Sequence, residues 1–394
     1  MTIALLGIPA AGSVSAQSLE ERKAAVQELR LKDYEPRSVF RIPRTDVRRA
    51  KFPVVDMHSH DYAADDAGVA AWVRTLDSCN IRYSSVMHCE WIGAPFEEYI
   101  RKYRPYGDRF LFWCCFDYTG FGEPGWAERA VRELERCHAL GARGVGEMVD
   151  KGLGDTYARP VPGRGIHLDD PRLRPLIERC GELGMPVSIH IAEPIWMYEP
   201  LDRHNDGLMN GADWAVDTSA EGCRGYEELM ATFERALAAY PGTTFIACHY
   251  LNMNQDLERL GTLLDRYPNL YVDIAGRAGE SAATPRATRR FLVRYADRVL
   301  FGTDNGTDPG MYRMVFRILE TDDEHFYNPD YGYHWAYSGF RLPDDVLRKI
   351  YYGNAARLLH LDEHPNEHEK TADHRPSALG GRVLVAAAHL ERRN

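Results

Sequence analysis

Short apolar runs alternate with longer amphipathic segments over most of the chain. Each short run is rich in β-branched and aromatic residues and lacks strict alternation of apolar and polar positions. This is the pattern of parallel strands that are covered on both faces. Eight such runs occur, at residues 53–57, 83–87, 110–116, 144–149, 186–191, 244–248, 270–274 and 299–301.

Helical patterns lie between these runs, at residues 125–140, 171–183, 226–239, 254–266 and 285–295. Gly141 and Gly184 directly follow the first two, and glycine is a common residue at the end of a helix. Eight strands that alternate with helices predict an α/β fold, a (β/α)₈ TIM barrel with long βα-loop insertions. A doubly wound open sheet is the structural alternative.

Segments outside this repeat define the predicted domain organisation. The long polar and aromatic connections at 193–225 and 321–342 follow predicted strands, and in a barrel such loops face the active site. We predict a signal peptide at 1–16, a helical lead-in at 17–50, the barrel at 51–361 and a polar, His-rich extension at 362–394. The extension is expected to lie on the surface and to have no catalytic role.

The N-terminus predicts export. An apolar stretch at residues 3–11 is followed by Val14-Ser15-Ala16 before Gln17, a small-residue cleavage site. We therefore expect a secreted or periplasmic protein, and the alternative is a cytoplasmic protein with an apolar N-terminus. No later stretch approaches the ~20 apolar residues of a membrane span, so no membrane partner is expected.

The composition of the chain limits the classes of binding partner that are expected. The hydrophobic content of 44% allows a large core, and the net charge of −10 argues against a nucleic-acid partner. A small-molecule substrate is expected, and a homo-oligomer is left open. The eight cysteines form no CxxC pair and fall mostly in apolar patterns. We expect buried free thiols rather than zinc ligands, and export would permit disulfides as the alternative.

Metal-competent side chains recur where the predicted strands end. The first strand ends in VVDMHSH, which places His58 and His60 two residues apart and therefore on one side. His190 follows in VSIHIAEP, His249 in FIACHYLN and Asp304 in VLFGTDNG. A single histidine at a strand end is usually a packed core residue. Five such residues at the C-terminal ends of barrel strands predict a divalent-metal site.

These motifs, in the order DMHSH, SIHIAEP, IACHYLN, FGTDNG and YYGNAARLL, resemble the amidohydrolase superfamily, in particular amidohydrolase family 2, over residues 53–361. That branch includes lactonases, amide hydrolases and non-oxidative decarboxylases. The resemblance implies His58, His60, His190 and Asp304 as metal ligands, with zinc expected and manganese or iron as alternatives. His249 would bind the metal or orient water and polarise the substrate.

The resemblance also implies that Asp304 acts as general base and then as general acid. It implies a closing helix at YGNAARLL, for which we expect Asn354 as N-cap. The chain departs from many relatives in having Tyr-Leu-Asn after His249. The resemblance therefore does not assign the substrate of a relative to this chain.

Glu147 lies within the fourth run, in GVGE, which is similar to a segment of TatD-like nucleases. A buried glutamate is costly unless it is paired or bound to a metal. It would bind a metal, orient a histidine ligand, or pair with Arg143 or Lys151. If Glu147 binds a metal, the site could hold two ions rather than one.

Weaker candidates for substrate contacts are His88, Arg277 and Trp196. Glu90, Asp117, Asp273, Tyr198 and His204 have comparable positions after strands, where ordinary loop hydrogen bonds are equally expected.

Three functions compete. We expect a metal-dependent hydrolase that uses activated water to cleave a C–O or C–N bond of a lactone, ester or amide. The alternative on the same site is a non-oxidative decarboxylase or hydratase of an aromatic or unsaturated acid. A barrel that binds a ligand without catalysis is the third, and the intact ligand set argues against it.

Overall fold

The computed structural model describes residues 18–87, 94–154, 165–328 and 333–362, without the side chains of residues 94 and 95. The predicted signal peptide, the tail after residue 362 and His88 with Glu90 lie outside the described residues. No described helix is both long and apolar enough to cross a membrane.

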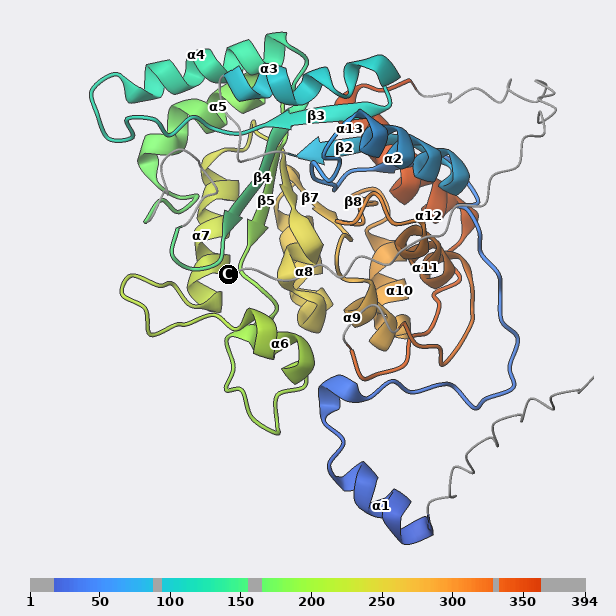
Figure 1. Ribbon diagram of the computed structural model, residues 1–394. Helices are drawn as coiled ribbons and strands as arrows, with labels where there is room; N and C mark the ends of the chain where they lie inside the picture. The colour runs from blue at the N-terminus through green and yellow to red at the C-terminus, as the bar shows by residue number, and fades with distance from the viewer. Residues whose placement is uncertain (1–17, 88–93, 155–164, 329–332, 363–394) are drawn as a thin grey trace, which may run out of the picture.

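Eight parallel strands form one sheet in the order of the sequence, as Figure 1 shows. The ends of this sheet meet, because Met57 N–H donates to Phe301 O (2.9 Å) and Asp304 N–H donates to His58 O (2.8 Å). This confirms the predicted TIM barrel, and sequential pairing excludes the doubly wound sheet. The strands are β1 (Val54–Asp56), β2 (Ile81–Met87), β3 (Phe110–Cys114), β4 (Gly144–Asp150), β5 (Val187–Ile191), β6 (Phe245–Ala247), β7 (Leu270–Asp273) and β8 (Val299–Leu300).

Helices lie between the strands and cover the outside of the barrel (Figure 1). The lead-in forms α1 (Leu19–Gln27), and the predicted helical patterns form α4 (Trp126–Ala139), α5 (Arg174–Glu182), α7 (Tyr226–Ala239), α8 (Leu257–Arg266) and α10 (Pro285–Arg294). Further helices are α2 (Asp66–Cys79), α3 (Ala94–Arg101), α6 (Leu208–Trp214), α9 (Ala278–Ala283), α11 (Pro309–Glu320), α12 (Asp344–Arg348) and α13 (Asn354–Leu359).

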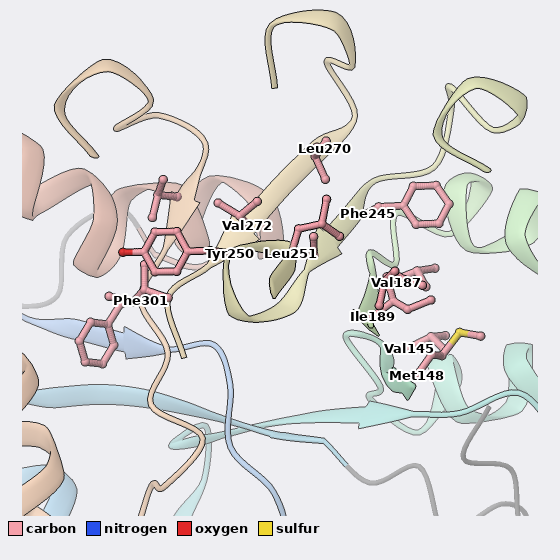
Figure 2. Packing of buried hydrophobic residues seen from close by; sticks show 14 of the residues in the cluster. Val145, Met148, Val187, Ile189, Phe245, Tyr250, Leu251, Leu270, Val272 and Phe301 are labelled. Carbon is pink, nitrogen blue, oxygen red and sulfur yellow. The ribbon is translucent and has the colours of Figure 1, made fainter. Parts of the chain in front are cut away.

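Two layers of apolar side chains hold the barrel together. Figure 2 shows part of the outer layer, in which alternate strand residues such as Val187, Ile189 and Phe245 pack outside the sheet. The inner layer contains Val55 and Trp113 and is bounded by side chains of α13. Both faces of every strand are therefore buried, which explains why the strands read as continuous apolar runs.

Two expectations need correction. Asn354 is not an N-cap: it is the first residue of α13, and its Nδ2 donates to Ala296 O and Val299 O (both 2.7 Å). It thereby ties the closing helix to the end of the barrel. Cys115 is disulfide-bonded, whereas the other six described cysteines are free thiols, as expected.

Candidate metal centre and active site

The residues predicted from the strand ends converge inside the C-terminal end of the barrel. Glu147 lies at the middle of this group. Its Oε1 is 3.2 Å from His190 Nδ1, 3.3 Å from His249 Nε2 and 3.6 Å from His58 Nε2, and its Oε2 is 3.4 Å from His60 Nε2. Asp304 Oδ1 lies 3.4 Å from His60 Nε2 and 3.8 Å from His58 Nε2. We call these six residues the metal centre.

A register shift in β4 directs Glu147 into the barrel. The pairing of β4 with β5 is irregular between Val145 and Met148, the two residues on either side of Gly146 and Glu147. Such irregularities commonly redirect a side chain. Gly146 is required here, because a Cβ on it would lie 2.7 Å from Ser188 Cβ.

Three of the histidines have one ring nitrogen fixed from outside the centre. Nδ1 of His58 lies 2.9 Å from Asp273 Oδ2, Nδ1 of His60 lies 3.2 Å from Met87 O, and Nδ1 of His249 lies 2.8 Å from Ala275 O. The two backbone carbonyl oxygens can only accept a hydrogen bond. The carboxyl group of Asp273 is ionised and can also only accept, because the charge of His58 outweighs the effect of burial and lowers the pKa of Asp273. The unprotonated Nε2 of each neutral ring therefore faces the centre, as a metal ligand must.

His190 faces the centre through Nδ1, whereas the other three histidines face it through Nε2. Its Nδ1 faces Glu147, and its Nε2 lies 3.5 Å from Glu193 Oε2. Glu193 is itself held by Lys151 and by Arg277, whose Nη2 lies 3.6 Å away. Glu193 could not be identified from the sequence, because its role depends on where the loop after β5 returns to the barrel. Lys151, one of the two cations considered as a partner of Glu147, forms its ion pair with Glu193.

Asp304 is oriented by a tyrosine that the sequence analysis missed. The Tyr62 hydroxyl donates to Asp304 O (2.8 Å) and to Asp304 Oδ1 (3.0 Å). Gly302 allows β8 to approach β1 here, because a Cβ on it would lie 2.7 Å from His58 Cβ. The glycine of the FGTD motif is thus needed for close approach.

The residues after His249 also have a structural role. Tyr250 and Leu251 pack in the outer core (Figure 2). Asn252 donates from Nδ2 to Ala192 O (2.9 Å) and accepts from Arg277 Nε (2.9 Å). The Tyr-Leu-Asn segment therefore joins the end of β5 to Arg277.

The electrostatics of the centre fit a bound cation. Burial opposes protonation of His58, but Asp273 and Glu147 raise its pKa to about 9. Burial also opposes the charge of Glu147, but the surrounding histidines hold its pKa well below the usual value. His58 Nε2 is buried without a hydrogen-bond partner in the described structure. Ligand atoms of His58, His249 and Asp304, and likewise of Glu147, His190 and His249, lie within 4.8 Å of one another. This set of imidazoles and carboxylates suits a divalent metal ion.

A cavity of about 380 Å³ opens onto the centre. Its lining includes Arg277, as predicted for substrate contact, together with Lys151, Met197, Trp214 and Tyr333. Trp196 is not part of that lining; its ring instead lies against Gly207, and its carbonyl accepts from Asn205 Nδ2 (2.8 Å). Trp196 therefore anchors the loop, while its neighbour Met197 reaches the cavity.

The closed barrel and its ring of histidines and carboxylates place the protein among the metal-dependent TIM-barrel enzymes. A family model described as Amidohydrolase (Amidohydro_2) matches residues 40–361, and the chain belongs to this family. The resemblance found in the sequence is therefore confirmed. None of the curated proteins matches the sequence.

Among solved structures, the chain is similar to a candidate amidohydrolase from Staphylococcus aureus, with 15% identity, 79% of this chain and 100% of that chain covered, and a TM-score of 0.50. It is also similar to 2,6-dihydroxybenzoate decarboxylase from Rhizobium, with 17% identity, 79% and 99% covered, and a TM-score of 0.45. A protein assigned as 2-pyrone-4,6-dicarboxylic acid hydrolase from Acinetobacter baumannii shares 12% identity, with 78% and 100% covered and a TM-score of 0.48. At these identities the likeness concerns the fold.

Proposed function

We propose that this enzyme is a metal-dependent hydrolase that cleaves a C–O or C–N bond of a small carbonyl compound, such as a lactone, ester or amide. The observation that supports this proposal is the exposure of Asp304. Its side chain is 34% exposed, compared with 10% for Glu147. Asp304 and Glu147 both line the cavity, and Asp304 is the more accessible of the two carboxylates to an incoming water molecule.

The metal would be zinc, with manganese or iron as alternatives, held by His58, His60, His190 and Asp304. Glu147 and His249 are proposed as further ligands, which allows a second ion. When bound, a divalent ion polarises a carbonyl oxygen and lowers the pKa of water from about 15.7 towards about 7.

Asp304 would accept a proton from the attacking water and pass it to the leaving oxygen or nitrogen. The hydrogen bond from Tyr62 orients the carboxylate for this transfer. His249 is buried, and burial together with the nearby charges of His190 and Arg277 outweighs Glu147 and lowers its pKa. Because its Nδ1–H donates to Ala275 O, a neutral His249 can only accept at Nε2. This favours binding a metal or orienting water over polarising a substrate carbonyl.

A decarboxylase or hydratase of an aromatic or unsaturated acid is the alternative, and the lining of the cavity is compatible with it. The cavity is lined by the cations Lys151 and Arg277 and by the aromatic rings of Trp214 and Tyr333. A guanidinium group can bind a substrate carboxylate with two hydrogen bonds. The same residues are equally suited to the carboxylate of a hydrolysis substrate, so they do not choose between the two reactions.

A product assay separates the two reactions. Metal-replete protein is supplied with lactones, amides and aromatic acids, and acid release and CO₂ release are measured in parallel. We expect acid release, and Asp304→Asn should lower the rate by about 10²–10⁴-fold. The matched control is Asp308→Asn, at the exposed N-cap of α11, which should retain the rate. CO₂ release without hydrolysis would replace the proposal with its alternative.

We further propose that the protein is exported. Protein purified from its native host should then begin at Gln17. A chain that retains Met1 in the cytoplasmic fraction would overturn this proposal without affecting the enzymatic one.

A further inference from the structure

The first described residues form an arm that is exposed over most of its length and is attached to the barrel near its end, where Thr45 binds Asp323 and Val47 packs against the core. From Ser18 to Arg49 no residue is buried, and α1 itself has no buried residue. In Figure 1, α1 stands clear of the barrel on the side where α6 lies. We call residues 18–49 the N-terminal arm. A helix of nine residues is marginal in water by itself, so α1 needs a surface to pack against.

Exposed apolar side chains concentrate in two places in the described structure. Seven of the eleven large hydrophobic residues that are exposed lie in the arm; they are Leu19, Val26, Leu29, Leu31, Tyr34, Val39 and Phe40. Val39 reaches 86% exposure. Three more are Trp214, which lines the active-site cavity, Tyr62, which binds Asp304, and Leu201, which lies in the same loop as Trp214; of the exposed residues described, only Val293 lies elsewhere. Exposed apolar surfaces of this kind mark sites at which a protein interacts with another protein or with a membrane.

The two surfaces also have opposite charge. Residues 18–50 contain nine Lys and Arg and six Asp and Glu, a net charge of +3. Residues 193–225, which we call the mouth loop, contain two Arg and seven Asp and Glu, a net charge of −5. The exposed Arg37, Arg41 and Arg44 make no ion pair in the described part of the chain, and neither do the exposed Glu199, Asp206 and Glu221 of the mouth loop. Complementary charge steers association and fixes its orientation.

We propose that the N-terminal arm of one copy packs on the mouth loop of a second copy, so that two copies exchange arms and each arm borders the partner's cavity. A second copy is the occupant because, within one chain, both surfaces remain exposed. Exchange of identical segments gives a closed twofold dimer, in which arm meets mouth loop twice. The proposal does not depend on the reaction that the enzyme catalyses.

Sedimentation of the full chain tests the dimer. Val39→Glu in the arm and Leu201→Lys in the mouth loop should each raise the dimer dissociation constant at least ~tenfold. Val39→Glu places a negative charge against the acidic mouth loop, and Leu201→Lys places a positive charge against the basic arm. The matched control is Val293→Glu on α10, an exposed apolar residue outside both surfaces, which should dimerise like wild type. A wild-type monomer at the highest soluble concentration, or equal dissociation constants for the Val39 and Val293 variants, would overturn the proposal.

Cross-linking between chains tests the exchange itself. Val39→Cys protein is mixed with Leu201→Cys protein and treated with a short bis-maleimide, and a mixture of Val293→Cys with Leu201→Cys serves as control. Peptides joining positions 39 and 201 of different chains are expected in the first mixture alone. Joining only within one chain, in a Val39→Cys/Leu201→Cys double variant, would mean that the arm closes over its own cavity. If the full chain co-sedimented with phosphatidylglycerol vesicles and did not dimerise, the partner of the arm would be a lipid surface. Either result refutes the exchange.

Discussion

At the scale of single residues, Glu147 is a buried carboxylate at the centre of the histidine cluster. It lies among four histidines, His58, His60, His190 and His249, at distances of 3.2–3.6 Å. A glutamate that only oriented one histidine would have a single such neighbour. Its central position therefore supports ligation over the two other roles considered from the sequence.

Metal content tests this role of Glu147. Glu147→Gln removes the charge that offsets the cation while keeping the size of the side chain, so we expect most of the bound metal to be lost on dialysis. Glu280→Gln is the control, because Glu280 is also a buried carboxylate but binds the Tyr333 hydroxyl (2.6 Å) away from the centre. Elemental analysis measures both. An unchanged metal-to-protein ratio in Glu147→Gln would leave the residue only an orienting role.

Asp273 offers a second test at this scale. Its Oδ2 holds Nδ1–H of His58, and its Oδ1 accepts from His249 N–H (2.9 Å). An asparagine can turn its amide towards His58 and so favour the wrong tautomer, with Nε2 protonated towards the centre. We expect Asp273→Asn to weaken metal affinity by roughly 10–100-fold, measured by competition with a chromogenic chelator. Wild-type affinity in a folded Asp273→Asn protein would argue against control of the tautomer.

The residues that could be predicted are those whose position follows from strand order alone. His58, His60, His190, His249 and Asp304 each lie at or just after the end of an apolar run, and parallel strands of a barrel bring those ends together. Tyr62 and Glu193 could not be predicted, because each depends on how a loop returns to the barrel. Trp196 was misplaced for the same reason: the loop directs Met197 rather than Trp196 into the cavity.

At the scale of elements, every strand was predicted to within a few residues, since burial on both faces produces an unmistakable apolar run. The helices α2 and α11 were not specified, and of the helical lead-in predicted at 17–50 only Leu19–Gln27 forms an α-helix. The register shift in β4 was beyond prediction, because the sequence shows only a glycine before Glu147. The need for that glycine appears once Ser188 of β5 lies beside it.

One prediction at this scale concerns the attachment of the N-terminal arm to the barrel. Asp323 is buried and accepts from Thr45 N–H (2.8 Å), from the Thr45 hydroxyl (2.7 Å) and from Arg317 Nε (2.7 Å). Asp323→Asn should lower the free energy of unfolding at pH 7 by about 2 kcal/mol, because bonds to a charged acceptor are lost. Asp322→Asn is the neighbouring control. Its ion pair with Arg341 is 69% and 75% exposed, and it should have little effect.

The effect of Asp323→Asn should also depend on pH. Burial opposes the charge of Asp323, but Thr45 and Arg317 lower its pKa below the ordinary value. Its stabilising contribution is therefore complete above the unfolded-state pKa of about 3.9 and is lost as pH falls through the lower pKa of the folded state. Urea unfolding of wild type and variant should thus converge in acid. A constant difference from pH 7 into that acidic range would contradict the ionic origin of the stabilisation.

At the scale of the whole molecule, the metal centre joins strands from around the barrel. Its proposed ligands lie within β4 and β5 or directly after β1, β6 and β8, so a bound ion would connect segments separated by more than two hundred residues. Without a cation, the centre confines two carboxylates and four imidazoles in a buried space. Binding to the folded state alone raises stability by about 4 kcal/mol when free metal exceeds its dissociation constant a thousandfold.

Removal of the metal should therefore lower the melting temperature of the whole barrel. For a domain of this size, about 4 kcal/mol corresponds to a shift of about 5 °C, which differential scanning calorimetry can measure before and after chelation. His190→Ala serves as the control: it should already have lost most of its metal, so chelation should shift its melting temperature much less. Restoring zinc should recover the transition of the wild type and leave that of the variant nearly unchanged. If chelated and metal-loaded wild type melted together, the centre would not contribute to the stability of the barrel, and its six converging side chains would need another explanation.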